Sequence, residues 1–258
     1  MKKRILYATD PHCGHLVGLC PSEVDPPVTT PKQEKYALVR SQVWDFFAAA
    51  VDKYRPYDVA IWGGDMTDGK GSRSGGTELL SNDWKVQVDI AVKVIEFVDA
   101  SVNRMVYGTP YHVSSEGTDI EDFIAGKVGA KIGSHEWYNI NGRIFDVKHK
   151  IGVSSIPHGR LTPLAREIMW NRLWYPRQPK ADVLLRGHVH YFEQIDHDDC
   201  LGFTGPALQG YGSKFGSREC PGKMDIGVLV FDVHSDGEIV WKKELANVST
   251  QTVRAEAL

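Results

Sequence analysis

Two histidines stand one residue apart in the stretch LLRGHVHYF, residues 184–192, directly after an apolar run that ends on Gly187. Neutral imidazole is a common ligand for divalent first-row metals, so His188 and His190 could bind such an ion at the end of a buried strand. Taken alone, the pair is better explained by one packed and one solvated histidine on the same strand. Whether it indicates chemistry therefore depends on the other residues that the chain brings to the same place.

Further residues with metal-binding side chains fall directly after other expected strands. In open α/β sheets, ligands bind outside the carboxyl ends of the strands, so one edge of the fold could gather all of these side chains. Carboxylates and imidazoles suit divalent metals, and an aspartate can bridge two ions that lie about 3.5–4 Å apart. An isolated histidine is more often a packing or surface residue, but this combination, in this order, favours a metal site. The residues are Asp10 and His12 in TDPH, Asp65 in GGDMTD, Thr109 and His112 in YGTPYH, and His149 in DVKH.

The pattern that must position these residues is typical of α/β packing, because short apolar runs alternate with amphipathic stretches of helical period. Parallel βαβ units are expected in the first half of the chain. The elements expected there are strands over residues 4–10, 58–65 and 104–108 and helices over 33–54 and 84–101.

The second half of the chain has the alternation and turn residues of hairpins. Together the two halves predict one domain over residues 1–246, a layered sandwich of sheets covered by helices, and a C-terminal tail over 247–258 that could be disordered. The expected elements are hairpins over residues 136–152 and 225–245, turning at Asn141-Gly142 and Asp236-Gly237, a helix over 162–173 and a strand over 181–187.

Composition limits the classes of function. The chain has 258 residues and a formal net charge of -3, which does not indicate wholesale binding to nucleic acid or to acidic membranes. No run approaches the roughly 18–20 apolar residues of a membrane span, and the apolar run after the basic N-terminus is too short for a signal peptide. The cysteines form no CxxC pair, which favours reduced thiols in a cytoplasmic protein, although Cys13 lies close enough to His12 and His15 to be a soft metal ligand.

The blocks DPH, GDMTD, GTPYH, KH and GHVH follow the order D-x-H, GDxxD, GNH[DE], His and GH[TS]H. In these blocks the chain resembles the calcineurin-like metallophosphoesterases, over residues 4 to about 240, and four of the five blocks match well. The resemblance implies an α/β fold of four layers, with two mixed β-sheets packed face to face and helices outside. It also implies hydrolysis of phosphate monoesters or diesters by hydroxide at a dinuclear metal site, without a phosphoenzyme.

The resemblance further implies a role for each matching residue. Asp68 would be a support residue that hydrogen-bonds nearby backbone rather than a ligand. Mn²⁺ is the family's common activator, and the ligand set also accepts Fe, Zn or Ni. The implied ligands are Asp10, His12 and His190 for one metal, His149, His188 and Thr109 for the other, and Asp65 as the bridge between them.

The third block departs from the family pattern and resembles instead a GTxxH arrangement of phage and bacterial phosphoesterases. If the chain is encoded by a virus, its expected location is the host cytoplasm. Thr109 stands where the asparagine is expected, and a hydroxyl is a weaker ligand than an amide oxygen. Glu116 is an alternative ligand, and a water could also fill the position. His112 is the candidate catalytic histidine, which would protonate the leaving oxygen beside Asp65; the alternative is that it only shapes its loop.

The substrate is less well indicated than the reaction. Lys70 and Arg73 could hold a non-reacting phosphate or sugar, and His158 and Arg160 could line the cleft; a solvated loop and an ordinary turn are the alternatives. A nuclease would use a basic and aromatic track, which a helix with a packed tryptophan face and solvated arginines explains slightly better. Two further alternatives are a non-catalytic scaffold with a degraded metal centre and a mononuclear hydrolase. The residues of the basic and aromatic track that a nuclease would use are Arg172, Trp174, Tyr175 and Arg177.

Overall fold

The computed structural model describes residues 1–28, 30–71, 74–112, 118–154, 156–197, 199–211 and 224–246. Arg73, Glu116, Cys220 and the tail over 247–258 lie outside the described residues. Among the described helices, none combines the length and the apolar character that crossing a bilayer requires.

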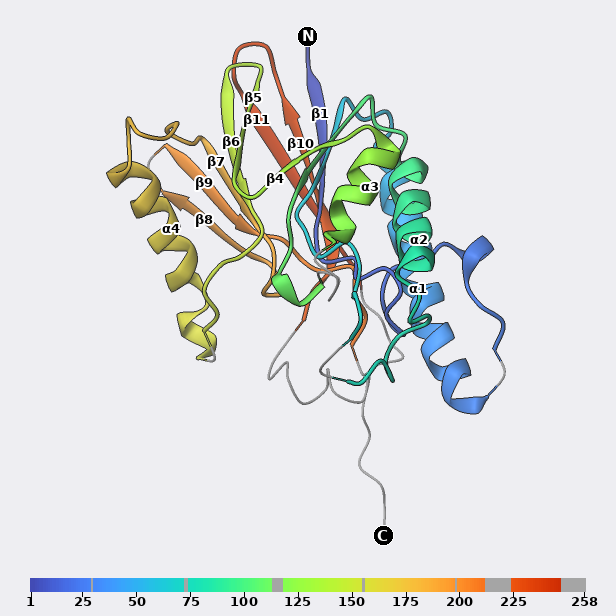
Figure 1. The fold of residues 1–258 in the computed structure, drawn as a ribbon. Coiled ribbons are helices and arrows are strands. Elements are labelled where there is room, and N and C mark those ends of the chain that lie inside the picture. Colours follow the sequence, from blue (N-terminus) through green and yellow to red (C-terminus); the bar gives the residue numbers. More distant parts are fainter. Residues whose placement is uncertain are drawn as a thin grey trace.

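The first sheet has six strands in the order β11-β10-β1-β2-β3-β4 (Figure 1). Strands β1 to β4 run parallel, and the hairpin β10–β11 joins the open side of β1 antiparallel. The sheet is therefore mixed, with the carboxyl ends of its parallel strands at one edge. The strands are β1 (Lys3–Ala8), β2 (Val59–Trp62), β3 (Val102–Val106), β4 (Lys131–Gly133), β10 (Ile226–Val233) and β11 (Ile239–Ala246).

The second sheet has five strands in the order β5-β6-β7-β9-β8. Its central strands β6, β7 and β9 run parallel, and β5 and β8 close it antiparallel on either side. The strands are β5 (Glu136–Ile140), β6 (Arg143–Lys148), β7 (Val183–Arg186), β8 (Glu193–His197) and β9 (Cys200–Thr204).

Apolar side chains from both sheets meet in one buried cluster, so the sheets pack face to face. Tyr7, Leu229 and Phe231 come from the first sheet, and Phe145 and Phe203 from the second. The ring of Phe231 packs edge-on against both Phe145 and Phe203, with centroids 5.7 and 5.3 Å apart. This contact fixes the two sheets against each other and leaves their outer faces to helices.

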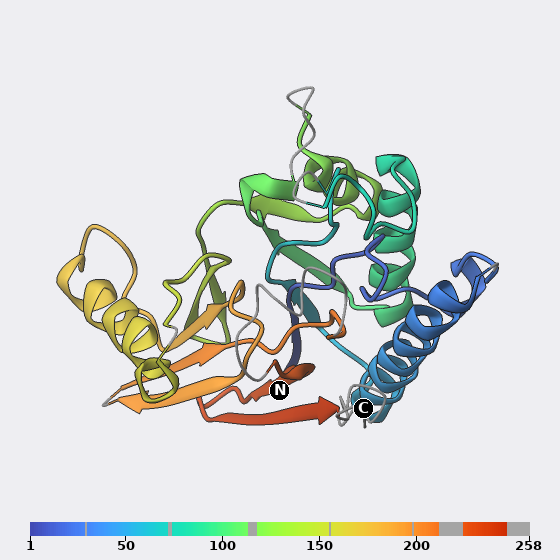
Figure 2. The same cartoon turned by 90° about the horizontal axis from the view of Figure 1, so that it is seen from below.

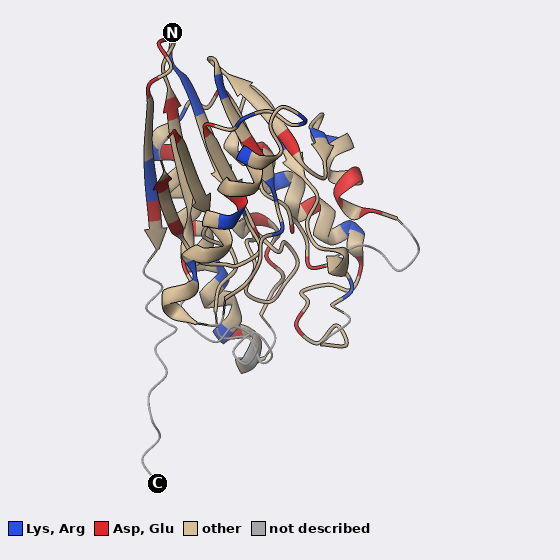
Figure 3. Cartoon of the chain, turned by 90° about the vertical axis from the view of Figure 1, so that its left-hand side faces the viewer, with Lys and Arg blue, Asp and Glu red and all other residues tan. Residues whose placement is uncertain are grey.

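Helices cover the two outer faces, and Figure 2 shows them at opposite sides of the molecule. The first sheet packs on α1 (Pro31–Tyr54), α2 (Trp84–Val98) and α3 (Ile120–Val128). The second packs on α4 (Leu161–Leu173), whose side Figure 3 faces. The expected fold of four layers, two mixed sheets with helices outside, is confirmed. Three short 3-10 helices, η1 (Ser22–Val24), η2 (Pro110–His112) and η3 (Pro157–Gly159), lie in the connections.

Several expected boundaries were too long. The first strand ends at Ala8 rather than at residue 10, because Asp10 has a positive φ that no extended strand can contain. Helix α2 ends at Val98 because Asp99 adopts the left-handed conformation and caps it. The helix α3 and the short strands β4, β8 and β9 were not predicted.

Candidate metal centre

The metal-binding side chains predicted from the sequence lie together where strands of both sheets end. Asp10 and His12 follow β1, Asp65 follows β2, and Thr109 and His112 follow β3. In the second sheet, His149 follows β6, while His188 and His190 follow β7. The polypeptide connects these loops by backbone hydrogen bonds, from Asp10 to Gly64, from His12 to Asp65 and from Gly187 to His149.

The backbone at this place is unusual. Among the described residues, seven that are not glycine have a positive φ, and five of these belong to the site. Side chains other than glycine rarely adopt this conformation, and such residues concentrate at functional sites, where the surrounding structure holds them. The five are Asp10, His12, Asp65, His188 and His190.

The first group of potential metal ligands consists of Asp10, His12 and His190, whose ligand atoms all lie within 4.8 Å of one another. The Nε2 atom of His190 lies 3.1 Å from Asp10 Oδ1 and 3.3 Å from His12 Nε2. Two imidazole nitrogens and one carboxylate oxygen therefore converge on a single point, as ligands of a divalent cation do.

The second group consists of Asp65, His149 and His188, with the same limit of 4.8 Å between ligand atoms. His149 Nδ1 donates to the carbonyl oxygen of Gly63 at 2.6 Å, so its Nε2 atom faces the centre, 3.0 Å from Asp65 Oδ2. The rings of His149 and His188 meet edge-on, with centroids 5.4 Å apart. A backbone carbonyl thus fixes the tautomer that a metal-binding histidine needs.

A third group, His12, Asp65 and His112, joins the first two because it shares one residue with each. His112 Nε2 lies 3.6 Å from Asp65 Oδ2, and the rings of His112 and His12 lie 4.9 Å apart. His112 is therefore the imidazole that stands between the two triads, at the position from which it could reach a bound substrate.

Carboxylate and hydroxyl groups around the ligands hold them in place. Asp68 Oδ1 lies 3.0 Å from His12 Nδ1, so a hydrogen on that nitrogen is bound to the carboxylate and His12 Nε2 faces the centre. Thr9 Oγ1 donates to Asp10 Oδ2 at 2.6 Å, and the His188 backbone N–H donates to the same oxygen at 3.0 Å. Asp68 thus contacts a ligand side chain, whereas the resemblance implied a contact with backbone.

Thr109 contacts Asp65 through two groups. Its backbone N–H donates to Asp65 Oδ1 at 2.6 Å, and its hydroxyl lies 3.2 Å from the same oxygen. The adjacent Gly108 permits this approach, because a Cβ atom there would lie 2.0 Å from Asp65 Oδ1. The loop after β3 therefore positions the carboxylate that lies between the two triads.

Glu121, in the unpredicted helix α3, contacts two loops of the centre and was not identified from the sequence. Its buried carboxylate accepts the backbone N–H of Met66 at 2.9 Å and that of Gly108 at 2.7 Å. It thereby joins the loop that carries Asp65 to the loop that carries Thr109. Burial and the charge of Asp65 raise the pKa of Glu121 to about 7. No local pattern marks this residue, because its partners are distant in sequence.

Opposite charges dominate the electrostatics of the centre. Burial alone would raise the pKa of Asp65, but the neighbouring His112 and His149 hold it well below its ordinary value. Burial alone would likewise lower the pKa of His149, but the carboxylates of Asp65 and Asp10 raise it to about 10. Burial alone would also raise the pKa of Asp68, but the hydrogen bond from His12 and the charges of His15, His12 and His112 together lower it to about 2. Asp65 and Asp68 are therefore ionised at neutral pH, the form in which a carboxylate such as Asp65 binds a metal.

Two of the predicted substrate contacts lie next to loops of this centre. Lys70 is exposed next to Gly69, where an added Cβ would lie 2.9 Å from His112 Cα. His158 is exposed in η3, and the Arg160 guanidinium lies over the ring of Tyr191, 4.5 Å from its centroid. Lys70 and Arg160 thus adjoin the loops of His112 and His190.

The basic and aromatic track lies elsewhere. Arg172 donates to the carbonyl oxygen of Ala181, which precedes β7, and it forms an ion pair with Asp199. It therefore lies at the amino end of β7, whereas His188 follows the carboxyl end of that strand. Trp174 and Tyr175, which follow α4, are exposed.

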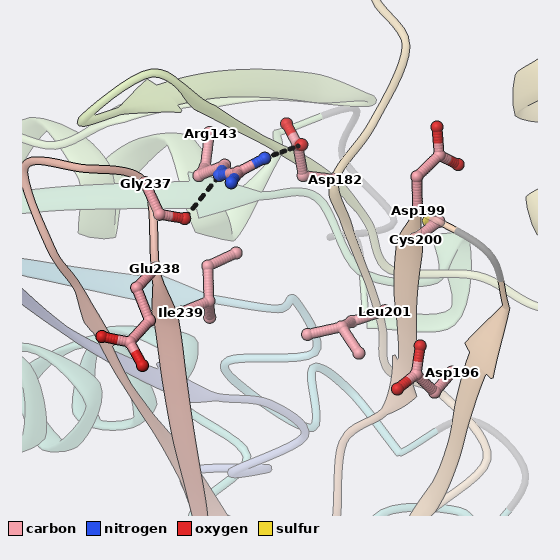
Figure 4. Close-up of a pocket in the computed structure, with 9 residues that line it drawn as sticks. All are labelled: Arg143, Asp182, Asp196, Asp199, Cys200, Leu201, Gly237, Glu238 and Ile239. Atoms are coloured by element: carbon pink, nitrogen blue, oxygen red, sulfur yellow. Dashed lines mark hydrogen bonds and ion pairs between the residues drawn. The ribbon is translucent and has the colours of Figure 1, made fainter.

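A separate pocket of about 220 Å³ is lined by several carboxylates (Figure 4). Asp182 is paired there with Arg143, and Asp199 with Lys180 and Arg172. Within the described part of the chain, the three groups with metal-binding geometry all lie at the centre described above and none in this pocket.

No protein-family model and no curated protein matches this sequence. Among solved structures, an archaeal phosphodiesterase is similar, with a TM-score of 0.50 and 13% identity over 94% of this chain and 99% of that chain. Vps29 from Entamoeba histolytica in complex with zinc has a TM-score of 0.43 and 13% identity over 94% and 98%. A predicted phosphoesterase from Streptococcus pneumoniae has a TM-score of 0.41 and 11% identity over 95% and 99%. At 13% identity, the likeness to the archaeal phosphodiesterase establishes that the two chains share a fold.

Proposed function

We propose that this chain, with its metallophosphoesterase fold, is a metal-dependent hydrolase of phosphate esters that uses two divalent cations. The observation that carries the proposal is the continuous set of three ligand groups, in which His12 and Asp65 are shared. One cation would be held by Asp10, His12 and His190. The other would be held by His149 and His188, with Asp65 between the two.

The side chains present fit such cations. His149 Nε2 is buried and makes no well-formed hydrogen bond, although it lies 3.0 Å from Asp65 Oδ2. In the metal-free protein the high pKa of His149 keeps this nitrogen protonated at neutral pH, and a divalent cation would displace that proton to bind the nitrogen. The set of imidazoles and carboxylates suits Mn²⁺, Fe, Zn or Ni. Mn²⁺ is our first choice because the motifs resemble a family in which it is the common activator.

Bound divalent cations supply Lewis acidity, which favours hydroxide as the nucleophile and offsets negative charge on the phosphoryl oxygens. The remaining steps belong to the side chains. His112, beside Asp65, would donate a proton to the leaving oxygen. Asp68 would hold His12 in its tautomer, and Thr109 would hold the Asp65 carboxylate in its orientation.

The substrate is proposed to be a phosphate monoester or diester. Lys70 and Arg160 adjoin the loops of the centre and would contact the non-reacting part of the substrate, with His158 and Arg73 as further candidates. A nuclease remains an alternative, but the basic and aromatic track lies at the far end of β7 from His188, which favours a small ester.

Hydrolysis of p-nitrophenyl phosphate and bis-p-nitrophenyl phosphate tests the proposal. Protein stripped with chelator and then supplied with Mn²⁺ should regain turnover on at least one ester. Asp65→Asn should abolish it, whereas Asp89→Asn, which changes an exposed carboxylate on α2, should not. Turnover that survives in Asp65→Asn, or no turnover with any divalent metal, would favour a non-catalytic scaffold.

A further inference from the structure

Large apolar side chains are exposed at the C-terminal end of α4. Monomeric proteins rarely expose contiguous apolar patches of this kind, and such patches mark interaction surfaces. We call these five residues the α4 apolar face: Met169, Trp170, Leu173, Trp174 and Tyr175, whose exposed fractions are 62, 51, 69, 49 and 61%.

Helix α4 is apolar on two opposite sides. Its inward side buries Leu164 and Ile168 against the second sheet, where Ile168 packs on Leu184 and Cys200. Its other side exposes Met169 and Leu173, whereas Trp170 and Trp174, about half exposed, also line a pocket of about 220 Å³ with His135 and Glu167. A helix that is apolar all round is normally buried, whereas a surface helix has one polar side. Within the described residues, α4 packs mainly on β8, β9 and η3, all on its inward side.

The size of the face fits association between proteins. Given the exposed fractions, the five side chains offer on the order of 600 Å² of accessible surface, since each aromatic residue can bury about 150–250 Å². A standard interface buries about 800 Å² per partner. The exposed Leu161 and Ile156, at the other end of the helix, could supply the remainder.

The charged side chains on and beside the α4 apolar face indicate which class of partner it binds. Arg172 is paired with Asp199, and Arg177 lies over the Trp174 ring, 5.8 Å from its centroid. Anionic lipid surfaces and nucleic acids require a cluster of available cations, whereas Arg172 and Lys180 share Asp199 as their ion-pair partner. Arg166, one turn before Trp170, is exposed, and its guanidinium lies beside Gly152.

We propose that two copies of this chain form a two-fold dimer through the α4 apolar face. In an isologous contact each residue meets the symmetry-related set, so apolar side chains meet apolar side chains. With the helices antiparallel about Met169 and Trp170, Arg166 meets Trp174 of the partner subunit, where a cation–π contact is favourable. The face lies at the amino end of β7, so the metal centres of both copies remain open.

Sedimentation velocity and light scattering over about 1–100 µM protein test the proposal, because dissociation constants in this range are resolved there. Wild-type protein should reach twice the chain mass of 28.8 kDa. Leu173→Glu and Met169→Glu, each at an exposed position, should raise the dimer dissociation constant by roughly 30-fold or more, as at interface hot spots. Leu38→Glu, at a position on α1 that is 51% exposed, should leave the dimer intact.

A monomeric wild-type protein at all concentrations would overturn the proposal, as would a dimer that both glutamate variants leave unchanged. Circular dichroism of each variant separates loss of association from loss of folding. Co-sedimentation of monomeric wild-type protein with vesicles of anionic phospholipid would assign the face to a membrane surface and would also contradict the dimer.

Discussion

Glu121→Gln tests how the metal centre is held together. The carboxylate of Glu121 accepts two backbone N–H groups, one from Met66 after Asp65 and one from Gly108 before Thr109. A glutamine offers a single acceptor oxygen, and its amide group would face the second N–H donor. Leaving one buried N–H without an acceptor costs about 1–3 kcal/mol, and loss of a group that supports a metal ligand typically weakens metal binding by about 10–100-fold.

The variant should therefore lose stability and Mn²⁺ affinity together. Denaturant unfolding in chelator measures the first, and isothermal titration calorimetry with Mn²⁺ measures the second. Asp122→Asn is the matched control, because this neighbouring carboxylate on α3 is exposed and accepts a hydrogen bond from the Tyr107 hydroxyl at 2.6 Å. Wild-type Mn²⁺ affinity in Glu121→Gln would refute the role of this carboxylate in positioning the site.

The pH dependence of the same pair of proteins adds a second readout. The folded pKa of Glu121 is about 7, because burial and Asp65 raise it above the ordinary 4.5. A raised pKa means that folding favours the neutral form of Glu121. The contribution of this side chain to the free energy of unfolding is therefore complete below about pH 4.5 and is lost as the pH rises through about 7. The stability lost in Glu121→Gln should therefore be smaller at pH 8 than at pH 5. An equal loss at both values would contradict the raised pKa.

Two further predictions concern the histidines of the centre. Asp68→Asn should weaken Mn²⁺ binding by about 10–100-fold, because His12 Nδ1 loses its carboxylate partner; titration calorimetry showing unchanged affinity would contradict this. In metal-free protein, the pKa of His149 near 10 predicts a stabilising ion pair with Asp65 that is complete below about pH 6.5 and lost as the pH approaches 10. Thermal denaturation in chelator should show this loss in the wild type, and His149→Gln should flatten it.

The sequence predicts the fold well where local patterns decide the structure. The hairpin at Asn141-Gly142 forms as expected, with positive φ at both residues, as its tight turn requires. Long helices with a clear apolar stripe, such as α1 and α2, were found with small errors at their ends. The short elements α3, β4, β8 and β9 were missed because three to nine residues carry too little periodicity to distinguish helix, strand and loop.

Some residues of the metal centre could likewise be predicted from local sequence patterns, and others could not. Residues that follow strands within compact motifs, such as Asp10, His12 and His188, could be grouped from the sequence, because parallel strands end at a common edge. Contacts between distant segments could not. Glu121 lies 55 residues from Met66, and only the packing of α3 against the first sheet brings them together.

Metal stoichiometry tests the central claim most directly. After equilibrium dialysis against Mn²⁺, mass spectrometry of the wild-type protein should count about two ions per chain, the number that a dinuclear site requires. His190→Ala and His188→Ala should each lose about one of them, because the two histidines belong to different ligand groups, while His197→Ala, at an exposed position in β8, should keep both. One ion in the wild type that persists in His188→Ala, or no bound ion, would contradict the dinuclear centre.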